Sequence, residues 1–135
     1  MAQIGLSDCS TDALGNVYGR RPGSTGGPGL LIAAHLDTVF PASTDLRIRR
    51  EGARIYGPGL GDNSLGLAAL LHLAQTMQRH DLPNEGEIWF VANVCEEGLG
   101  DLRGIRAAVD RLQDRIRTAI ALEGCDQGRV FHEAI

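Results

Sequence analysis

Histidine and acidic residues that could bind metal lie at three widely separated places in the chain. They occur as His35-Leu36-Asp37, as Asp62 within the segment 57–64, and as Glu96-Glu97, each directly after an apolar or glycine-rich run. Imidazole and carboxylate groups gathered at strand ends can hold two divalent metals and activate a water between them. The pattern is typical of a zinc hydrolase centre.

Three apolar runs predict the buried β-strands that would position these residues. The runs cover 30–34, 87–94 and 118–122, and the third is followed by Glu123. Continuous apolar runs of this length suit strands covered on both faces. A shorter strand is expected after the turn at Gly15-Asn16, and the Pro/Gly/Ser-rich stretch 20–29 is expected to be a loop.

Two segments predict helices between these strands. The segment 65–79 is rich in Leu and Ala, with Ser64 as an N-cap and a stop signal at 81–83. Its apolar residues surround nearly the whole circumference, which predicts a buried helix. A second helix of about three turns is predicted from the helical spacing of four apolar residues, Leu102, Ile105, Val109 and Leu112.

The order strand, helix, strand, helix, strand predicts an α/β fold. The expected architecture is a three-layer αβα sandwich with a mostly parallel mixed sheet. Ligands of such sheets bind outside the carboxyl ends of the strands. We therefore expect five residues to meet there, namely His35, Asp37, Glu96, Glu97 and Glu123.

Composition narrows the function classes. The 135 residues suit one domain, and 43% hydrophobic with 22% charged residues is the mix of a soluble globular protein. A net charge of -4 without a Lys-rich run gives no footprint for nucleic acid or an anionic membrane. Cys9, Cys95 and Cys125 form no Cys-x-x-Cys pair, so a reducing, cytoplasmic compartment is expected.

Four ordered motifs make the chain similar to a known family. They are Ala-His-Leu-Asp-Thr-Val at 34–39, the glycine-rich segment 57–66 with Asp62, Cys-Glu-Glu-Gly at 95–98 and Leu-Glu-Gly at 122–124. In this order they resemble the di-zinc metallopeptidases and amidohydrolases that include aminoacylase, succinyl-diaminopimelate desuccinylase, glutamate carboxypeptidase and peptidase T. The resemblance extends from 12–16 to Glu123.

The resemblance implies a zinc-exopeptidase-like fold and a role for each site residue. Its metal ligands are His35, Asp62, Glu97 and Glu123. His35 would bind one zinc, Asp62 would bridge both, and Glu97 and Glu123 would each complete one metal. Asp37 would accept the other N–H of the imidazole. Glu96 would be the general base that moves a proton from water to the leaving amine.

The implied function is zinc-dependent hydrolysis of a peptide or N-acyl-amino-acid amide bond, with exopeptidase action on short peptides favoured. A complete site would hold two zinc ions, with Co or Mn as substitutes. Family members often have a cis peptide bond after the bridging aspartate, and a trans form here is the alternative.

The chain also departs from the family pattern. By this resemblance, we expect residues 1–135 to be a partial, truncated catalytic domain without the lid domain or the C-terminal part that carries a further histidine ligand. The second metal would then need His132, a water or another chain. Strands left unpaired would expose apolar surface, so self-association is expected.

Other interpretations stay open. A catalytically silent fragment or metal-binding module could keep only the fold. His-x-Asp can be a surface pair, Glu-Glu can be solvated charge, and Asp62 can cap a helix. His72 and His80 are expected to be packing or surface residues. A nucleotide-binding loop is disfavoured because Asp62 stands where the third glycine of Gly-x-Gly-x-x-Gly is needed.

Overall fold

A mixed five-stranded sheet forms the centre of the protein. The computed structural model describes residues 1–124 and 128–131. In the order β1-β2-β6-β3-β7, the strands are β1 (Ser7–Thr11), β2 (Val17–Arg21), β6 (Gly86–Asn93), β3 (Gly27–His35) and β7 (Ile116–Ala121). β3 pairs in parallel with β6 and β7, while β2 is antiparallel to β6 and β1. Only β2 therefore runs against the other strands of the sheet.

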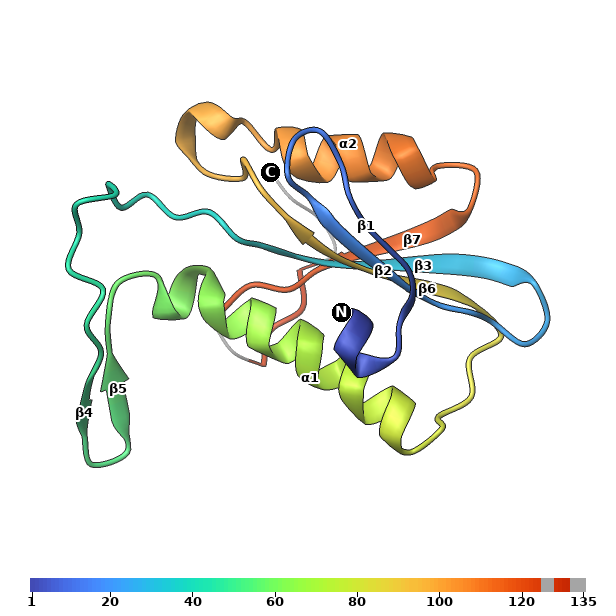
Figure 1. The fold of residues 1–135 in the computed structure, drawn as a ribbon, viewed down its shortest axis with the longest axis horizontal. Coiled ribbons are helices and arrows are strands. Elements are labelled where there is room, and N and C mark those ends of the chain that lie inside the picture. Colours follow the sequence, from blue (N-terminus) through green and yellow to red (C-terminus); the bar gives the residue numbers. More distant parts are fainter. Residues whose placement is uncertain (125–127, 132–135) are drawn as a thin grey trace.

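Helices cover both faces of this sheet, which confirms the predicted three-layer architecture. Helix α1 (Leu65–Arg79) lies on one face and helix α2 (Arg103–Leu112) on the other (Figure 1). Side chains alternate between the faces along each strand. Ile32, Ala34, Ile88 and Phe90 pack with Leu70 and Ala74 of α1. Leu31, Ala33, Trp89 and Val91 pack with Ala108 and Leu112 of α2.

Helix α1 has the bounds predicted from the sequence, but its predicted burial is wrong. Its buried residues are Gly66, Leu70 and Ala74, which form one stripe. Leu71 and Leu73 on the opposite side are 39% and 38% exposed. The reason is that only one sheet face packs against α1, so the apolar residues elsewhere on its circumference face outward.

The prediction of a buried strand at 118–122 is also wrong. β7 is the edge strand of the sheet, and every residue of it after Ile116 is exposed. β3 occupies one side of β7, and no described segment pairs with its other side. An apolar run thus marked a strand correctly without revealing whether that strand is central or at the edge.

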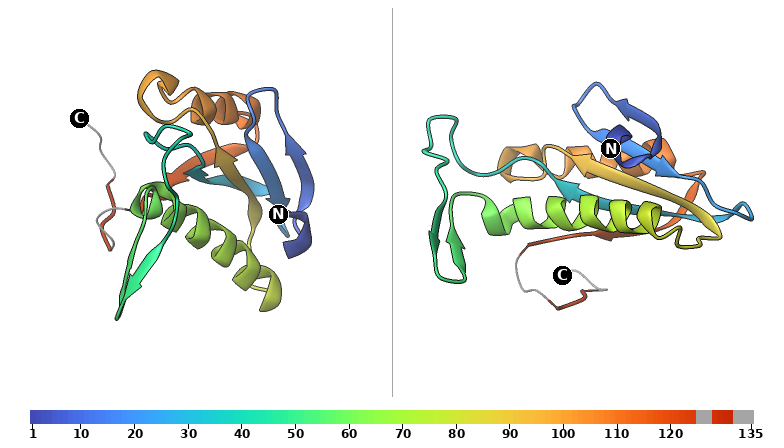
Figure 2. Two further views of the ribbon diagram at one scale, coloured as in Figure 1. Left: turned by 60° about the vertical axis from the view of Figure 1, so that its left-hand side comes forward. Right: turned by 60° about the horizontal axis from the view of Figure 1, so that its bottom comes forward.

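Several short elements had no clear sequence signal. These are β1, the hairpin of β4 (Arg49–Glu51) and β5 (Arg54–Tyr56), the 3-10 helices η1 (Ala2–Ile4) and η3 (Gly98–Gly100), and the irregular helical turn η2 (Leu60–Ser64). The hairpin projects away from the body of the protein (Figure 2). Its six residues are exposed, so they show no alternation of buried and exposed positions. No described helix is long and apolar enough to cross a membrane.

The packing predicts a large difference between two apolar substitutions. Phe90 in the centre of β6 is 0% exposed, whereas Leu99 is 100% exposed. Phe90→Ala should lower the free energy of unfolding by about 3–5 kcal/mol because it leaves a cavity. Leu99→Ala should change it by less than about 0.5 kcal/mol. Urea unfolding followed by circular dichroism checks both, and equal effects would contradict the assigned core.

Candidate metal centre

A single buried imidazole lies at the centre of the site. His35 is the last residue of β3 and is 2% exposed. Its Nε2 atom lies 2.9 Å from Oδ1 of Asp62 and 3.6 Å from Oε2 of Glu123. Asp62 comes from the turn before α1, and Glu123 follows β7. Three segments that are distant in sequence therefore meet at one nitrogen atom.

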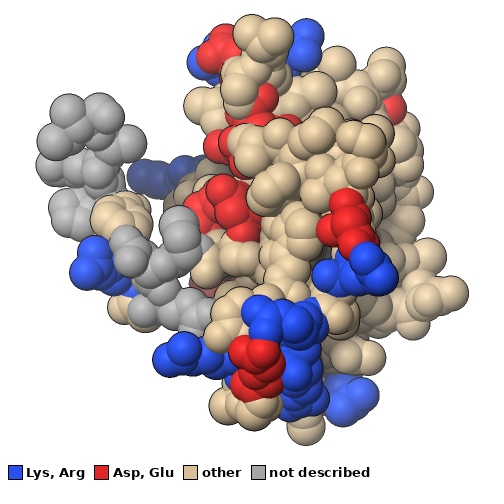
Figure 3. Space-filling view, turned by 90° about the vertical axis from the view of Figure 1, so that its left-hand side faces the viewer, with Lys and Arg blue, Asp and Glu red and all other residues tan. Residues whose placement is uncertain are grey.

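Two groups of possible ligands share this imidazole. One contains His35, Asp62 and Glu123, and the other contains His35, Glu96 and Glu97. Within each group the ligand atoms lie within 4.8 Å of one another. Nitrogen and carboxylate oxygen donors at such spacing suit Zn²⁺. Acidic side chains gather on the face of the protein shown in Figure 3.

Asp37 lies at the site but makes different contacts from those predicted. The Nδ1 atom of His35 lies 2.9 Å from the backbone carbonyl oxygen of Asp37, and 3.7 Å from its Oδ1. The carboxylate instead accepts the backbone N–H groups of Glu96 and Glu97, at 3.1 and 3.0 Å. A carbonyl can only accept, so Nδ1 carries a proton and Nε2 faces the acidic groups.

Negative charge at the site shifts the pKa values of three groups. Burial lowers the pKa of His35, but the Asp37 carbonyl and the carboxylates of Glu123, Glu96 and Asp62 raise it above its ordinary value of 6.5. Desolvation raises the pKa of Glu123 and of Glu97, and neighbouring carboxylates raise both further. A bound cation would stabilise this arrangement, because it favours the charged forms of the carboxylates.

Comparison with known proteins identifies the family. Residues 31–132 match the model of Peptidase family M20/M25/M40. The chain belongs to this family. The match contains every predicted site residue, and the peptide bond after Asp62 is cis, which is the form that the resemblance implies.

Two relatives share part of this M20 sequence. Carboxypeptidase G2 from Pseudomonas sp. (strain RS-16) is 30% identical over 106 residues, which cover 77% of this chain and 24% of that protein. Succinyl-diaminopimelate desuccinylase from Coxiella burnetii is 30% identical over 94 residues, covering 65% of this chain and 25% of that protein. The chain thus spans about a quarter of the length of these relatives.

Solved structures share the fold. Aminopeptidase PepT from Bacillus cereus superposes with a TM-score of 0.71 at 22% identity, over 90% of this chain and 35% of that one. A tripeptidase from Staphylococcus aureus superposes with a TM-score of 0.65 at 25% identity, over the same shares.

Asn63 is a buried polar residue beside Asp62 to which the sequence assigned no role. It is 1% exposed, and its Oδ1 accepts the N–H of Gly66 in the first turn of α1 at 3.0 Å. Ser64, the predicted N-cap, makes no such bond. Gly66 permits this contact, since a Cβ there would lie 2.0 Å from Oδ1 of Asn63. An uncharged amide beside Asp62 does not by its residue type suggest a role in metal binding or proton transfer.

Asn16 is a second buried amide that supports the site from a distance. It is 0% exposed, accepts the N–H of Val94 and donates to the carbonyl oxygen of Gly104, both at 3.0 Å. These bonds tie the chain after β6 to the start of α2. Asn16 has two sequence signals, the predicted turn at Gly15-Asn16 and its place in the segment 12–16 where the family resemblance begins, and neither indicates a role at the site.

The remaining histidines are less informative. His72 and His80 are both exposed, so of the two expected roles they are surface residues and not packing residues. His132 lies outside the described residues, so its predicted contribution to the second metal stays a prediction.

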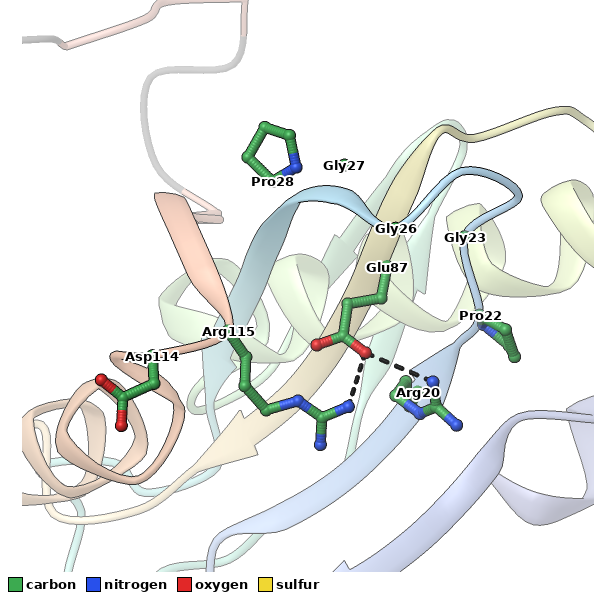
Figure 4. A pocket seen from close by; sticks show the side chains of 9 residues that line it. All are labelled: Arg20, Pro22, Gly23, Gly26, Gly27, Pro28, Glu87, Asp114 and Arg115. Atoms are coloured by element: carbon green, nitrogen blue, oxygen red, sulfur yellow. Dashed lines mark hydrogen bonds and ion pairs between the residues drawn. The ribbon is translucent and has the colours of Figure 1, made fainter.

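Cavity size alone does not locate this site. A cavity of about 70 Å³ adjoins His35, Asn93 and Glu123, between the strand ends and α2. A larger one of about 440 Å³ lies at the amino-terminal ends of β3, β6 and β7 (Figure 4). There Arg20 and Arg115 both bind Glu87, at 3.3 and 2.7 Å. These charges satisfy one another, so we place the chemistry at the smaller cavity.

The pKa shifts predict how metal binding depends on pH. Protons compete with metal for His35, and its raised pKa means that this competition begins above pH 6.5 as pH falls. Zn²⁺ affinity measured by calorimetry should therefore decrease steadily between about pH 8 and 5.5. Exposed His72 provides a control, because His72→Gln should leave the profile unchanged. Affinity that is constant over this range would contradict the assignment of His35.

Proposed function

We propose that this chain carries the metal centre of a zinc-dependent hydrolase that cleaves a peptide or N-acyl-amino-acid amide bond. The main support is the convergence of Asp62, Glu96, Glu97 and Glu123 around the buried imidazole of His35 in an M20 family fold. Nothing else in the described chain combines nitrogen and carboxylate donors in this way.

The distances favour a particular distribution of ligands. His35, Asp62 and Glu123 would hold one zinc, because both carboxylates face Nε2 of the imidazole. Asp62 would also bridge to a second zinc with Glu97, whose pKa is raised in part by the nearby Asp62 carboxylate. His132, a water or another chain would supply a further ligand. Co²⁺ or Mn²⁺ could replace zinc at such nitrogen and oxygen ligands.

Glu96 is the proposed general base, and Asp37 is the residue that positions it. Bound zinc would polarise the amide carbonyl and lower the pKa of a bound water to about 7. The Glu96 carboxylate would take up a proton and pass it to the leaving amine. Asp37 holds the backbone N–H groups of Glu96 and Glu97, so it fixes the base and the ligand relative to each other.

The substrate proposal rests on the relatives. Those reported above are named as a carboxypeptidase, a desuccinylase, an aminopeptidase and a tripeptidase. We propose a short peptide or N-acyl amino acid as substrate, with exopeptidase action favoured. We also propose that residues 1–135 form part of a larger catalytic domain. The cytoplasmic location expected from the cysteine content stays a prediction.

Metal analysis with two variants tests the proposed roles. Wild-type protein dialysed against trace zinc should retain one or two zinc ions per chain by elemental analysis. Asp62→Ala should lose them because it removes the bridging carboxylate. Glu96→Gln should keep its zinc, and any hydrolysis of dipeptides or N-acyl amino acids should fall by about 10²–10⁴-fold because proton transfer is lost.

Each outcome bears on one of the proposals. An empty site in Glu96→Gln would show that Glu96 is a ligand rather than the base. Zinc-loaded wild type that hydrolyses none of these substrates would support the metal centre, and it would not separate a catalytically silent metal-binding module from part of a larger catalytic domain. No zinc in well-folded wild type would mean that the chain keeps the family's fold without its chemistry.

The exposed edge of β7 predicts association between copies of the chain. Within residues 1–124 and 128–131, no strand pairs with the outer edge of β7, and Ile120 is 45% exposed. Such an edge pairs readily with another strand. In purified protein, the strand that pairs with this edge would come from a second copy of the chain. Size-exclusion chromatography with light scattering should show dimers or larger species, and Ile120→Lys should shift them toward monomer. A stable wild-type monomer would contradict this expectation.

A further inference from the structure

Asn63 occupies a position from which it can control two elements at once. Its side chain is 1% exposed and lies between the turn that carries Asp62 and the loop that carries Glu123. Through Oδ1 it accepts the N–H of Gly66 and so caps α1. Through Nδ2 it donates to the carbonyl oxygen of Leu122 at 2.8 Å. The cap stabilises the start of α1, while the second bond holds the residue before Glu123, which is a proposed metal ligand.

Leu122, the residue before Glu123, is held through both of its backbone polar groups. The N–H of Leu122 donates to the carbonyl oxygen of Ala33 in β3 at 2.8 Å, and the carbonyl of Leu122 accepts from Asn63. The two loops also touch, because a Cβ on Gly124 would lie 1.6 Å from the carbonyl oxygen of Gly61. The chain leaving β7 is therefore tied to β3 and to the turn of Asp62.

We propose that Asn63 is a positioning residue for the metal centre. Its amide N–H holds the Leu122 carbonyl, which keeps the Glu123 carboxylate at the separation from Asp62 needed to bind the same cation with His35. This inference rests on the proposed function for the identity of the cation. The competing explanation is that Asn63 only caps α1.

The Asn63→Asp substitution separates these two explanations. Aspartate has nearly the same shape and keeps an oxygen that can cap α1. It places a second carboxylate oxygen, in place of the donor, opposite the Leu122 carbonyl, so that bond is lost and the two oxygens repel. The added negative charge by itself would attract a cation more strongly. Attraction between the added charge and the cation therefore cannot explain weaker metal binding in Asn63→Asp.

Cobalt binding gives the first readout. We expect Asn63→Asp to bind Co²⁺ about 10–100-fold more weakly than wild type, the range for residues that support metal ligands. The visible absorption of bound Co²⁺ should also change, because the carboxylate of Glu123 is displaced. Ser64→Ala is the matched control, since Ser64 is exposed and makes no capping bond. It should bind Co²⁺ with wild-type affinity and spectrum.

Metal-free protein gives the second readout. Backbone amide NMR signals of Leu122 and Glu123 should shift in Asn63→Asp, while the helix content by circular dichroism stays at the wild-type level. Asn63→Ala removes both bonds, so it should lose helix content as well as Co²⁺ affinity. The positioning role would be supported if Asn63→Asp has more helix content than Asn63→Ala but binds Co²⁺ as weakly.

The outcomes distinguish this inference from the proposed function. Unchanged Co²⁺ affinity and unchanged Glu123 signals in Asn63→Asp would overturn the inference and leave Asn63 as a helix cap. Wild type that binds neither Co²⁺ nor Zn²⁺ would overturn the proposed function. The amide signals would then still decide whether Asn63 holds the Glu123 loop.

Discussion

The repulsion among the carboxylates around His35 is the constraint on which the rest of the site depends. Asp62, Glu96 and Glu123 all raise the pKa of this buried imidazole, and Glu97 is close enough to raise the pKa of Glu123. Groups of like charge would move apart in a flexible chain. They remain together because parallel pairing of β3 with β6 and β7 brings the carboxyl ends of three strands to one edge.

Hydrogen bonds between the loops at this edge keep the acidic groups in place. The N–H of Leu36 donates to the carbonyl oxygen of Asn93, and that of Leu122 donates to Ala33, so the backbones of neighbouring strands stay joined beyond their last ladder residues. Asp37 extends this connection to Glu96 and Glu97 through its carboxylate. The loops therefore behave as one connected unit, which reduces the reorganisation needed to bind a cation.

The predicted ligands and the supporting residues differ in how visible they are in a sequence. His35, Glu123 and the two glutamates at 96–97 have side chains that can bind metal or transfer protons, and their place after apolar runs predicted that they would meet, whereas Asp62 was assigned through the family resemblance. Asn63 and Asn16 have neutral amides, which are common in turns and loops. Their importance comes from complete burial and from bonds to residues about 60 to 90 positions away.

The sequence by itself determined the strands β2, β3, β6 and β7, the helices α1 and α2, and the strand ends at which Glu96, Glu97 and Glu123 lie, because local apolar patterns and turn signals report these directly. Tertiary structure alone decided that β7 is an exposed edge, that α1 buries only one stripe, and that the carboxylate of Asp37 binds backbone N–H groups instead of the imidazole. These features depend on which segments become neighbours in space. Pairing and packing between distant segments leave no periodic signal in either segment alone.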